Sequence, residues 1–358
     1  MSYINNYKTS ISLLGLLIII GVLSLFVGVY EVNIIDVLKR NDSVQLEMLI
    51  LSRLPRLLAI VCTGMGLSVA GLIMQKLCMN KFVSPSTGAT ISSAQLGILL
   101  ALLFLPNSTI VSRAILAFIA SLIGTLIFVW FIQKMQFKEI VMVPLVGIMF
   151  SNIVGGITSF IAFRYEMTQA LATWLTGSFS LIIKDRYEIV FLVVPLLIIA
   201  FVFANHFNIV GLGKDFSKNL GVNYQVILFV GLAIAAMLTS SIVVIVGSIS
   251  YIGLIVPNLV SMYKGDHLKG TLIDTALAGA LFVLICDIIG RTLIAPYELP
   301  IDLIVGVLGS VIFVALLFYR LRYGNKSISI VLNERKNSKV LKLKNKEILD
   351  NEYWNITK

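Results

Sequence analysis

Repeated apolar stretches, many of them about 20 residues long, are separated by short polar segments along most of the chain. A helix of that length crosses a hydrocarbon core of roughly 30 Å, and inside lipid every backbone polar group needs an internal partner. We therefore expect an all-α integral membrane protein with about ten transmembrane helices. The expected spans lie near 11–30, 54–77, 86–106, 111–133, 139–163, 187–205, 225–246, 249–263, 270–294 and 301–320.

Two features are expected to interrupt this helical pattern. No charged residue occurs in 225–263, a run too long for a single crossing. Glycine and serine are common where helices end, so we expect a break at 247–248 and a short eighth span after it. Pro144 lies inside the fifth expected span, where it should kink the helix.

The distribution of positive charge predicts the orientation. Hydrophobic residues make up 58% of the chain and charged residues only 13%, yet the net charge is +10. With the N-terminus inside, most Lys and Arg fall on inner segments and in the tail, as the positive-inside rule requires. We expect a transmembrane domain at 1–323, a basic cytoplasmic tail at 324–358, and both termini in the cytoplasm. The basic run 336–346 is solvated and poorly patterned, so no nucleic-acid partner is expected.

The polar stretch 205–224 interrupts the middle of the apolar chain and is expected to be cytoplasmic. Its apolar residues recur three to four positions apart, which predicts one sticky helical face. Such a face indicates a docking surface for another protein, with a glycine ending the helix; an unstructured connector is the alternative. The residues concerned are Leu212, Asp215, Phe216, Asn219, Leu220 and Gly221.

Three arginines fall on the expected outer side, where positive charge is otherwise scarce: Arg53, Arg56 and Arg291. Guanidinium groups form geometrically defined pairs with carboxylates, which suits docking of an external partner. Two alternatives remain open. Arg53 and Arg56 could anchor the helix at lipid headgroups, and Arg291 could pair with Asp287 one helical turn away.

Residues for catalysis, metal binding or ATP binding are not apparent in the sequence. Cys62, Cys78 and Cys286 form no C-x-x-C pair, and His206 and His267 do not stand at metal-ligand spacing. There is no Gly-rich phosphate-binding motif ending in Gly-Lys-Ser/Thr. We therefore expect neither a catalytic site nor a metal or cofactor on this chain.

Several motifs carry a resemblance to a known family. Residues 247–258 read Gly-Ser-Ile-Ser-Tyr-Ile-Gly-Leu-Ile-Val-Pro-Asn, and Gly-Asp-His follows at 265–267. This run resembles the signature of the iron-siderophore and vitamin B12 (FecCD-type) permease family of ABC importers. Further segments follow the family's order and spacing: 53–56, 68–71, 84–85, 174–178, 220–222 and 298–300.

The chain departs from the common family pattern at four places. The family often has His after the proline-rich turn, Asn-Pro-Leu-Ala before 84–85, Ala-Asp in the ninth span and Leu-Pro-Val-Gly in the outer loop. This chain has Asn258, Asn-Lys-Phe-Val at 80–83, Cys-Asp at 286–287 and Leu-Pro-Ile-Asp at 299–302. These variants resemble the branch that imports catecholate-type iron siderophores such as petrobactin.

The resemblance implies a type II importer permease in the cytoplasmic membrane that carries an iron-siderophore chelate. It implies a second permease (copy or paralogue), two ABC ATPases that use ATP and Mg, an extracellular siderophore-binding lipoprotein, and surrounding membrane lipids. By the same resemblance, the three arginines would meet acidic residues of the binding protein, and 205–224 would contact the ATPase. The start of the fifth span would constrict the path as a cytoplasmic gate: Glu139, Ile140, Val141, Met142 and Val143.

Other functions remain as alternatives. Within the same family the cargo could be vitamin B12 or haem. In a different class, an ion-coupled secondary transporter would use Asp287 as its carboxylate, with Asp274 as a weaker candidate. An intramembrane enzyme would need a nucleophile with a base, or a metal triad, and the expected spans contain neither.

Overall fold

The computed structural model describes residues 2–28, 43–107, 109–135, 142–184, 187–316 and 318. The chain divides into two compact units, Met1–Gly309 and Ser310–Lys358. All helices discussed below lie in the first unit, except that the helix Ile301–Leu316 continues into the second. The expected boundary between permease domain and tail, at 323–324, lies outside the described residues.

Within the described residues, seven helical segments are long and apolar enough to cross a membrane. Two shorter apolar helices, α5 (Thr90–Phe104) and Ile301–Leu316, accompany them. No strand is present in the described part of the chain, so the all-α expectation is confirmed. The long segments are α1 (Ser2–Phe26), α3 (Ser43–Met48) continuing through η1 (Leu49–Arg53) into α4 (Leu54–Leu77), α6 (Ile110–Lys134), α7 (Met142–Arg164), η2 (Glu188–Leu192) with α9 (Val193–Val210), α11 (Tyr224–Val246) and α13 (Leu268–Thr292).

The break expected at 247–248 is confirmed. Helix α11 ends at Val246, Gly247 has φ +89°, and the short helix α12 (Ile252–Lys264) follows. A side chain at position 247 would have to accept a positive φ, and its Cβ would lie 2.7 Å from the Thr176 carbonyl oxygen. Glycine is therefore required at this position by both conformation and space.

The structure describes α7 from Met142, two residues before Pro144, and residues 136–141 lie outside the described residues. The expected kink at Pro144 therefore stays a prediction. Pro257, which the sequence analysis considered only as part of the motif 247–258, lies inside α12. A short helix, α8 (Thr168–Leu175), follows α7.

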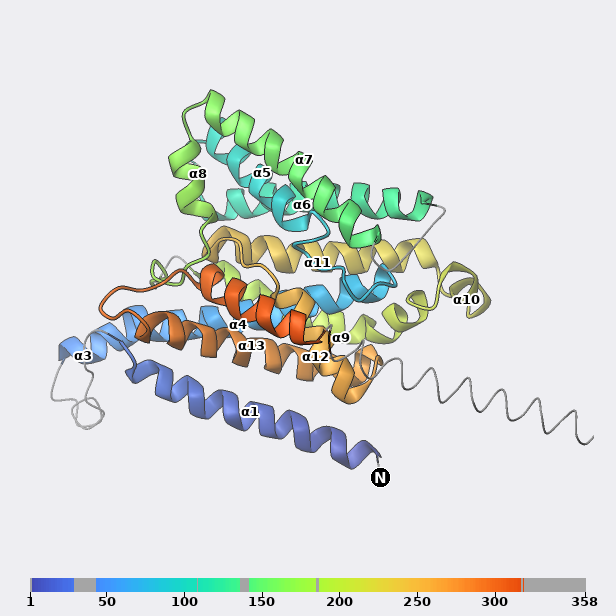
Figure 1. Ribbon diagram of the computed structural model, residues 1–358, viewed down its shortest axis with the longest axis horizontal. Helices are drawn as coiled ribbons and strands as arrows, with labels where there is room; N and C mark the ends of the chain where they lie inside the picture. Colours follow the sequence, from blue (N-terminus) through green and yellow to red (C-terminus); the bar gives the residue numbers. More distant parts are fainter. Residues whose placement is uncertain are drawn as a thin grey trace, which may run out of the picture. The chain divides into compact units, whose positions relative to one another are not determined.

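Helix α4 forms the centre of the first unit and packs against α13, α11, α12 and α9 (Figure 1). Small residues permit this close packing. A Cβ at Gly64 would lie 2.4 Å from the Gly279 carbonyl oxygen, and one at Gly71 would lie 1.9 Å from the Gly253 carbonyl oxygen. The backbones of α13 and α12 therefore touch α4 directly, as small residues at helix contacts allow.

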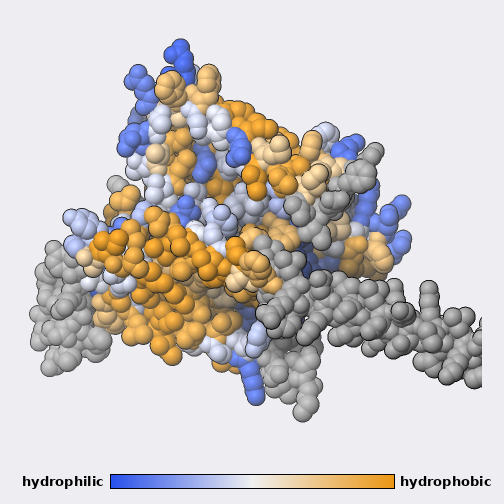
Figure 2. Space-filling model, in the orientation of Figure 1, coloured by the Kyte–Doolittle hydropathy of each residue, from blue (hydrophilic) through white to orange (hydrophobic). Residues whose placement is uncertain are grey.

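The remaining helices lie on two sides of this centre. Helices α5, α6 and α7 gather beyond α11, whereas α1 lies along α13 (Figure 1). The viewed face carries a broad hydrophobic surface, with hydrophilic side chains gathered mainly at its edges (Figure 2). On α1, Ile11, Ile18 and Ile19 are exposed. A surface of this kind fits lipid contact, because apolar side chains are the ones that hydrocarbon solvates.

Candidate functional site

The stretch expected to dock a partner folds as a short helix, α10 (Lys214–Asn219), between α9 and α11. Gly213 precedes it with φ +107°, and Gly221 ends it with φ +72°. The backbone N–H of Val222 donates to the Ser217 carbonyl at 2.9 Å, which closes the last turn around the left-handed glycine. The expected role of Gly221 as the helix end is confirmed.

The apolar face of this region is exposed. Leu212, Phe216 and Leu220 have exposed fractions of 61%, 63% and 59%. Asp215 and Asn219 are also exposed, whereas Ser217 is fully buried and donates its hydroxyl to the Gly213 carbonyl at 2.8 Å. Leu212 precedes α10 rather than lying within it, because the helix is shorter than the sequence pattern predicted. Three large apolar side chains on and beside α10 are thus exposed, whereas Ser217 within the helix is buried.

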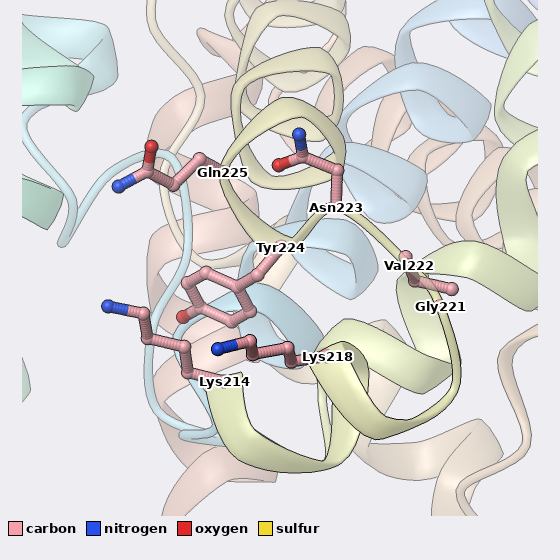
Figure 3. Close-up of a pocket in the computed structure, with 7 residues that line it drawn as sticks. All are labelled: Lys214, Lys218, Gly221, Val222, Asn223, Tyr224 and Gln225. Atoms are coloured by element: carbon pink, nitrogen blue, oxygen red, sulfur yellow. The ribbon is translucent and has the colours of Figure 1, made fainter.

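A cavity of about 490 Å³ opens beside this face (Figure 3). Lys214 and Lys218, one turn apart on α10, share its lining with Tyr224 at the start of α11. Among the described residues, no carboxylate is recorded in an ion pair with either lysine. The surface around α10 therefore combines an apolar ridge with a cationic recess, and sequence reasoning identified only the ridge.

At the other end of α4, Arg56 is the hub of an ion-pair network. Its Nη2 lies 2.8 Å from Asp287 Oδ1 on α13, and its Nη1 lies 2.9 Å from both carboxylate oxygens of Glu298. Only 14% of the Arg56 side chain is exposed. Neither expected role of Arg56, as a free docking group or as a lipid anchor, anticipated these partners.

Arg291 extends the network to α1. Its Nη2 lies 2.9 Å from Asp287 Oδ2, so the ion pair expected from their spacing is present. The geometry of this contact does not meet that of a hydrogen bond. Arg291 Nη1 also donates to the backbone carbonyls of Ser24 and Val27. Arg53 donates to the Leu25 carbonyl at 2.6 Å. All three arginines therefore bond within the molecule, and their expected role in docking an external partner stays a prediction.

Glu298 is the acidic residue at the exposed edge of this network. Burial alone would raise the pKa of its carboxyl, but the Arg56 charge and the Ser180 hydroxyl together hold that pKa below its usual value. Ser180 donates to Glu298 Oε2 at 2.9 Å. Glu298 is 27% exposed, so the solvent-accessible edge of the network carries a carboxylate beside Arg56.

Three interruptions of the helical chain meet at one place. Residues 175–178 run beside 246–248, where Ser178 N donates to the Val246 carbonyl and Ser248 N donates to the Leu175 carbonyl. The Asp302 carboxylate accepts the backbone N–H of Ser250 at 2.9 Å. Irregular backbone at membrane depth is tolerated where it is buried in protein or lines a cavity. Sequence reasoning noted Asp302 only as a departure from the family and missed this contact.

The expected gate lies mostly beyond what the structure describes. Glu139, Ile140 and Val141 fall outside the described residues. Met142 is exposed at the start of α7, whereas Val143 is buried. Among the residues described, no group of three or more His, Cys, Asp or Glu side chains could hold a metal ion.

Comparison with known proteins decides the family. The model of the FecCD transport family matches residues 16–319. The chain belongs to this family. It is 44% identical to the petrobactin import system permease protein YclN of Bacillus subtilis, over 86% of this chain and 97% of that protein. It is 38% identical to the petrobactin import system permease protein FatD of Bacillus anthracis, over 84% of this chain and 88% of that protein.

A solved structure supports the same fold for this FecCD permease. An inward-facing conformation of a metal-chelate type ABC transporter matches 87% of this chain and 99% of its own, with a TM-score of 0.75 and 26% identity. The expected type II importer permease fold is thereby confirmed, and the chain is a multi-pass membrane protein of a transport family.

Proposed function

We propose that this FecCD permease moves an iron-siderophore chelate of the catecholate class across the cytoplasmic membrane as one subunit of an ABC importer. The observation that carries the proposal is its similarity to two permeases named for petrobactin import, at 44% and 38% identity over most of their length. A ferric-anguibactin transport permease of Vibrio anguillarum is 36% identical, over 82% of this chain and 93% of that protein, which supports a ferric siderophore as the cargo.

The ATPase that drives transport would dock on α10. An exposed apolar face held on a short anchored helix fits a groove on an ATPase, because the ordering cost of the helix is already met before docking. The neighbouring recess lined by Lys214 and Lys218 would accept a carboxylate of the same ATPase. Two ATPases would serve two permeases, this chain and a copy or paralogue of it.

An extracellular binding protein would dock at the edge that carries Arg56 and Glu298. Acidic groups on that partner would compete with Glu298 for the Arg56 guanidinium, while Arg53 and Arg291 hold the surrounding helices in place. Each exposed pair contributes only about 0–1 kcal/mol, so docking would need several such contacts and would weaken in salt.

With the binding protein outside and the ATPase inside, both termini and α10 would lie in the cytoplasm. The gate at 139–143 would lie on the same side. Facing apolar side chains of two permeases would close the path there by excluding water. Single cysteines at positions 140 and 141 test the gate. They should crosslink between subunits in the closed state, and failure to crosslink in every nucleotide state would exclude it.

An ion-coupled secondary transporter is less well supported. Such a transporter needs a buried acid that exchanges its ion during the cycle. Asp287 contacts two arginines, and Asp274 is paired with Lys264 and accepts a hydrogen bond from Ser10. Both carboxylates are thus engaged in contacts that join helices.

A panel of radiolabelled cargoes tests the substrate. The permease, its partner permease and their ATPase, reconstituted with the binding protein, should take up a ferric catecholate siderophore in preference to ferric citrate, haem or vitamin B12. Equal uptake of all four, or preference for vitamin B12 or haem, would contradict the proposed cargo while leaving the importer class intact.

A further inference from the structure

A groove of about 920 Å³ lies over α13 and is walled by α1 on one side and α12 on the other. Both walls pack on α13, which supplies the floor through Asp274 and Ala278. Lys8 lies on the α1 wall, and Tyr263 on the α12 wall is 88% exposed. The groove belongs neither to the α10 surface nor to the Arg56 network.

The groove changes from polar to apolar along its length. Lys8, Tyr263 and Lys264 lie toward the end where α1 begins and α12 finishes. About one helical turn further in, Ser12 is followed by an apolar lining of Leu13, Leu259 and Ala278. A ligand that matches this order has a polar head and a hydrocarbon chain.

The two lysines that line the groove differ in their ion pairing. Lys264 contacts Asp274, and Ser10 donates to the other oxygen of that carboxylate at 2.6 Å, so this pair is balanced within the protein. The two side chains are 10% and 3% exposed. Lys8 is exposed, and among the described residues no carboxylate is recorded in a pair with it. The groove therefore carries a net positive charge at its polar end.

We propose that this groove binds an anionic glycerophospholipid. Its phosphate would lie against the Lys8 ammonium and the Ser12 hydroxyl, and one acyl chain would cover Leu13, Leu259 and Ala278. Helix α1 exposes apolar side chains beside the groove, and such a surface suits contact with lipid. Cationic pockets between membrane helices favour anionic headgroups. The inference does not depend on which cargo the permease carries.

Native mass spectrometry of the full chain in a non-ionic detergent tests the proposal. Phosphatidylglycerol should remain bound, whereas phosphatidylcholine with the same acyl chains should be retained less. Lys8→Gln should weaken phosphatidylglycerol binding about fivefold, since one basic residue near a membrane surface contributes about 1 kcal/mol. Lys269→Gln is the matched control, because Lys269 lies over the Phe201 ring at 6.0 Å and does not line the groove.

Two further arms distinguish the source of the phosphate and the role of the apolar end. Glycerol 3-phosphate alone should not displace the lipid, and Ala278→Phe should reduce binding by filling the floor. Displacement by glycerol 3-phosphate would show a free-phosphate site and overturn the lipid assignment. Equal retention of both lipids, unchanged by Lys8→Gln, would show non-selective annular lipid and would also overturn it.

Discussion

The Arg56 guanidinium lies 2.8 Å from the Asp287 carboxylate, which joins the first turn of α4 to the C-terminal part of α13. Arg56→Gln should therefore destabilise the permease by about 1–3 kcal/mol, since it leaves a nearly buried carboxylate with one cation fewer. Thermal unfolding in detergent, without any binding protein, measures this directly. Glu298→Gln should cost less, because Arg56 keeps its contact with Asp287. Equal stability of Arg56→Gln and the wild type would show that the network does not hold the helices.

The lowered pKa of Glu298 predicts a dependence of stability on pH. A carboxyl that ionises more readily in the folded chain adds stability at pH values above its ordinary pKa of 4.5, and loses it as the pH falls through the lowered folded value. The difference in unfolding midpoint between the wild type and Glu298→Gln should be constant from neutral pH down to about 4.5 and then shrink. A difference that persists well below that value would contradict the assigned Arg56 and Ser180 contacts.

The lysine pair on α10 should contribute to ATPase binding through charge. Lys214→Glu together with Lys218→Glu should reduce co-purification of the ATPase at least about tenfold, because like charges across an interface cost several kcal/mol. Binding by the wild type should weaken as salt is raised from about 0.1 M to about 1 M. Lys269→Glu, on α13 and outside this recess, is the control. Undiminished co-purification of the double variant would show that the recess does not contact the ATPase.

Asp302 should stabilise the junction of the chain breaks. Asp302→Gly restores the residue common in the family and removes the acceptor of the Ser250 N–H, at a cost of about 1–3 kcal/mol. Asp302→Asn is the matched control, because its amide oxygen still accepts this hydrogen bond. The glycine variant should unfold at lower temperature and transport more slowly than the asparagine variant. Identical behaviour of the two variants would show that the contact has no structural role.

Local features of the sequence predicted much of this fold. The charge-free run 225–263 and Gly247 within it predicted the break between α11 and α12. The partners of Arg56 were not predictable in this way, because Asp287 and Glu298 are distant in sequence and only tertiary packing brings them together. Asp302 was missed for the same reason, since its partner is a backbone N–H on another segment.

Uptake driven by ATP through α10 is the central claim, and one transport measurement tests it most directly. Proteoliposomes that contain the permease pair, the ATPase and the binding protein should accumulate radiolabelled ferric siderophore only when ATP is present on the ATPase side. Leu220→Asp, which places a charge on the exposed apolar face, should abolish that uptake without reducing the amount of folded permease. Uptake that follows an imposed proton gradient without ATP, or that is undiminished in Leu220→Asp with its ATPase still coupled, would contradict the account.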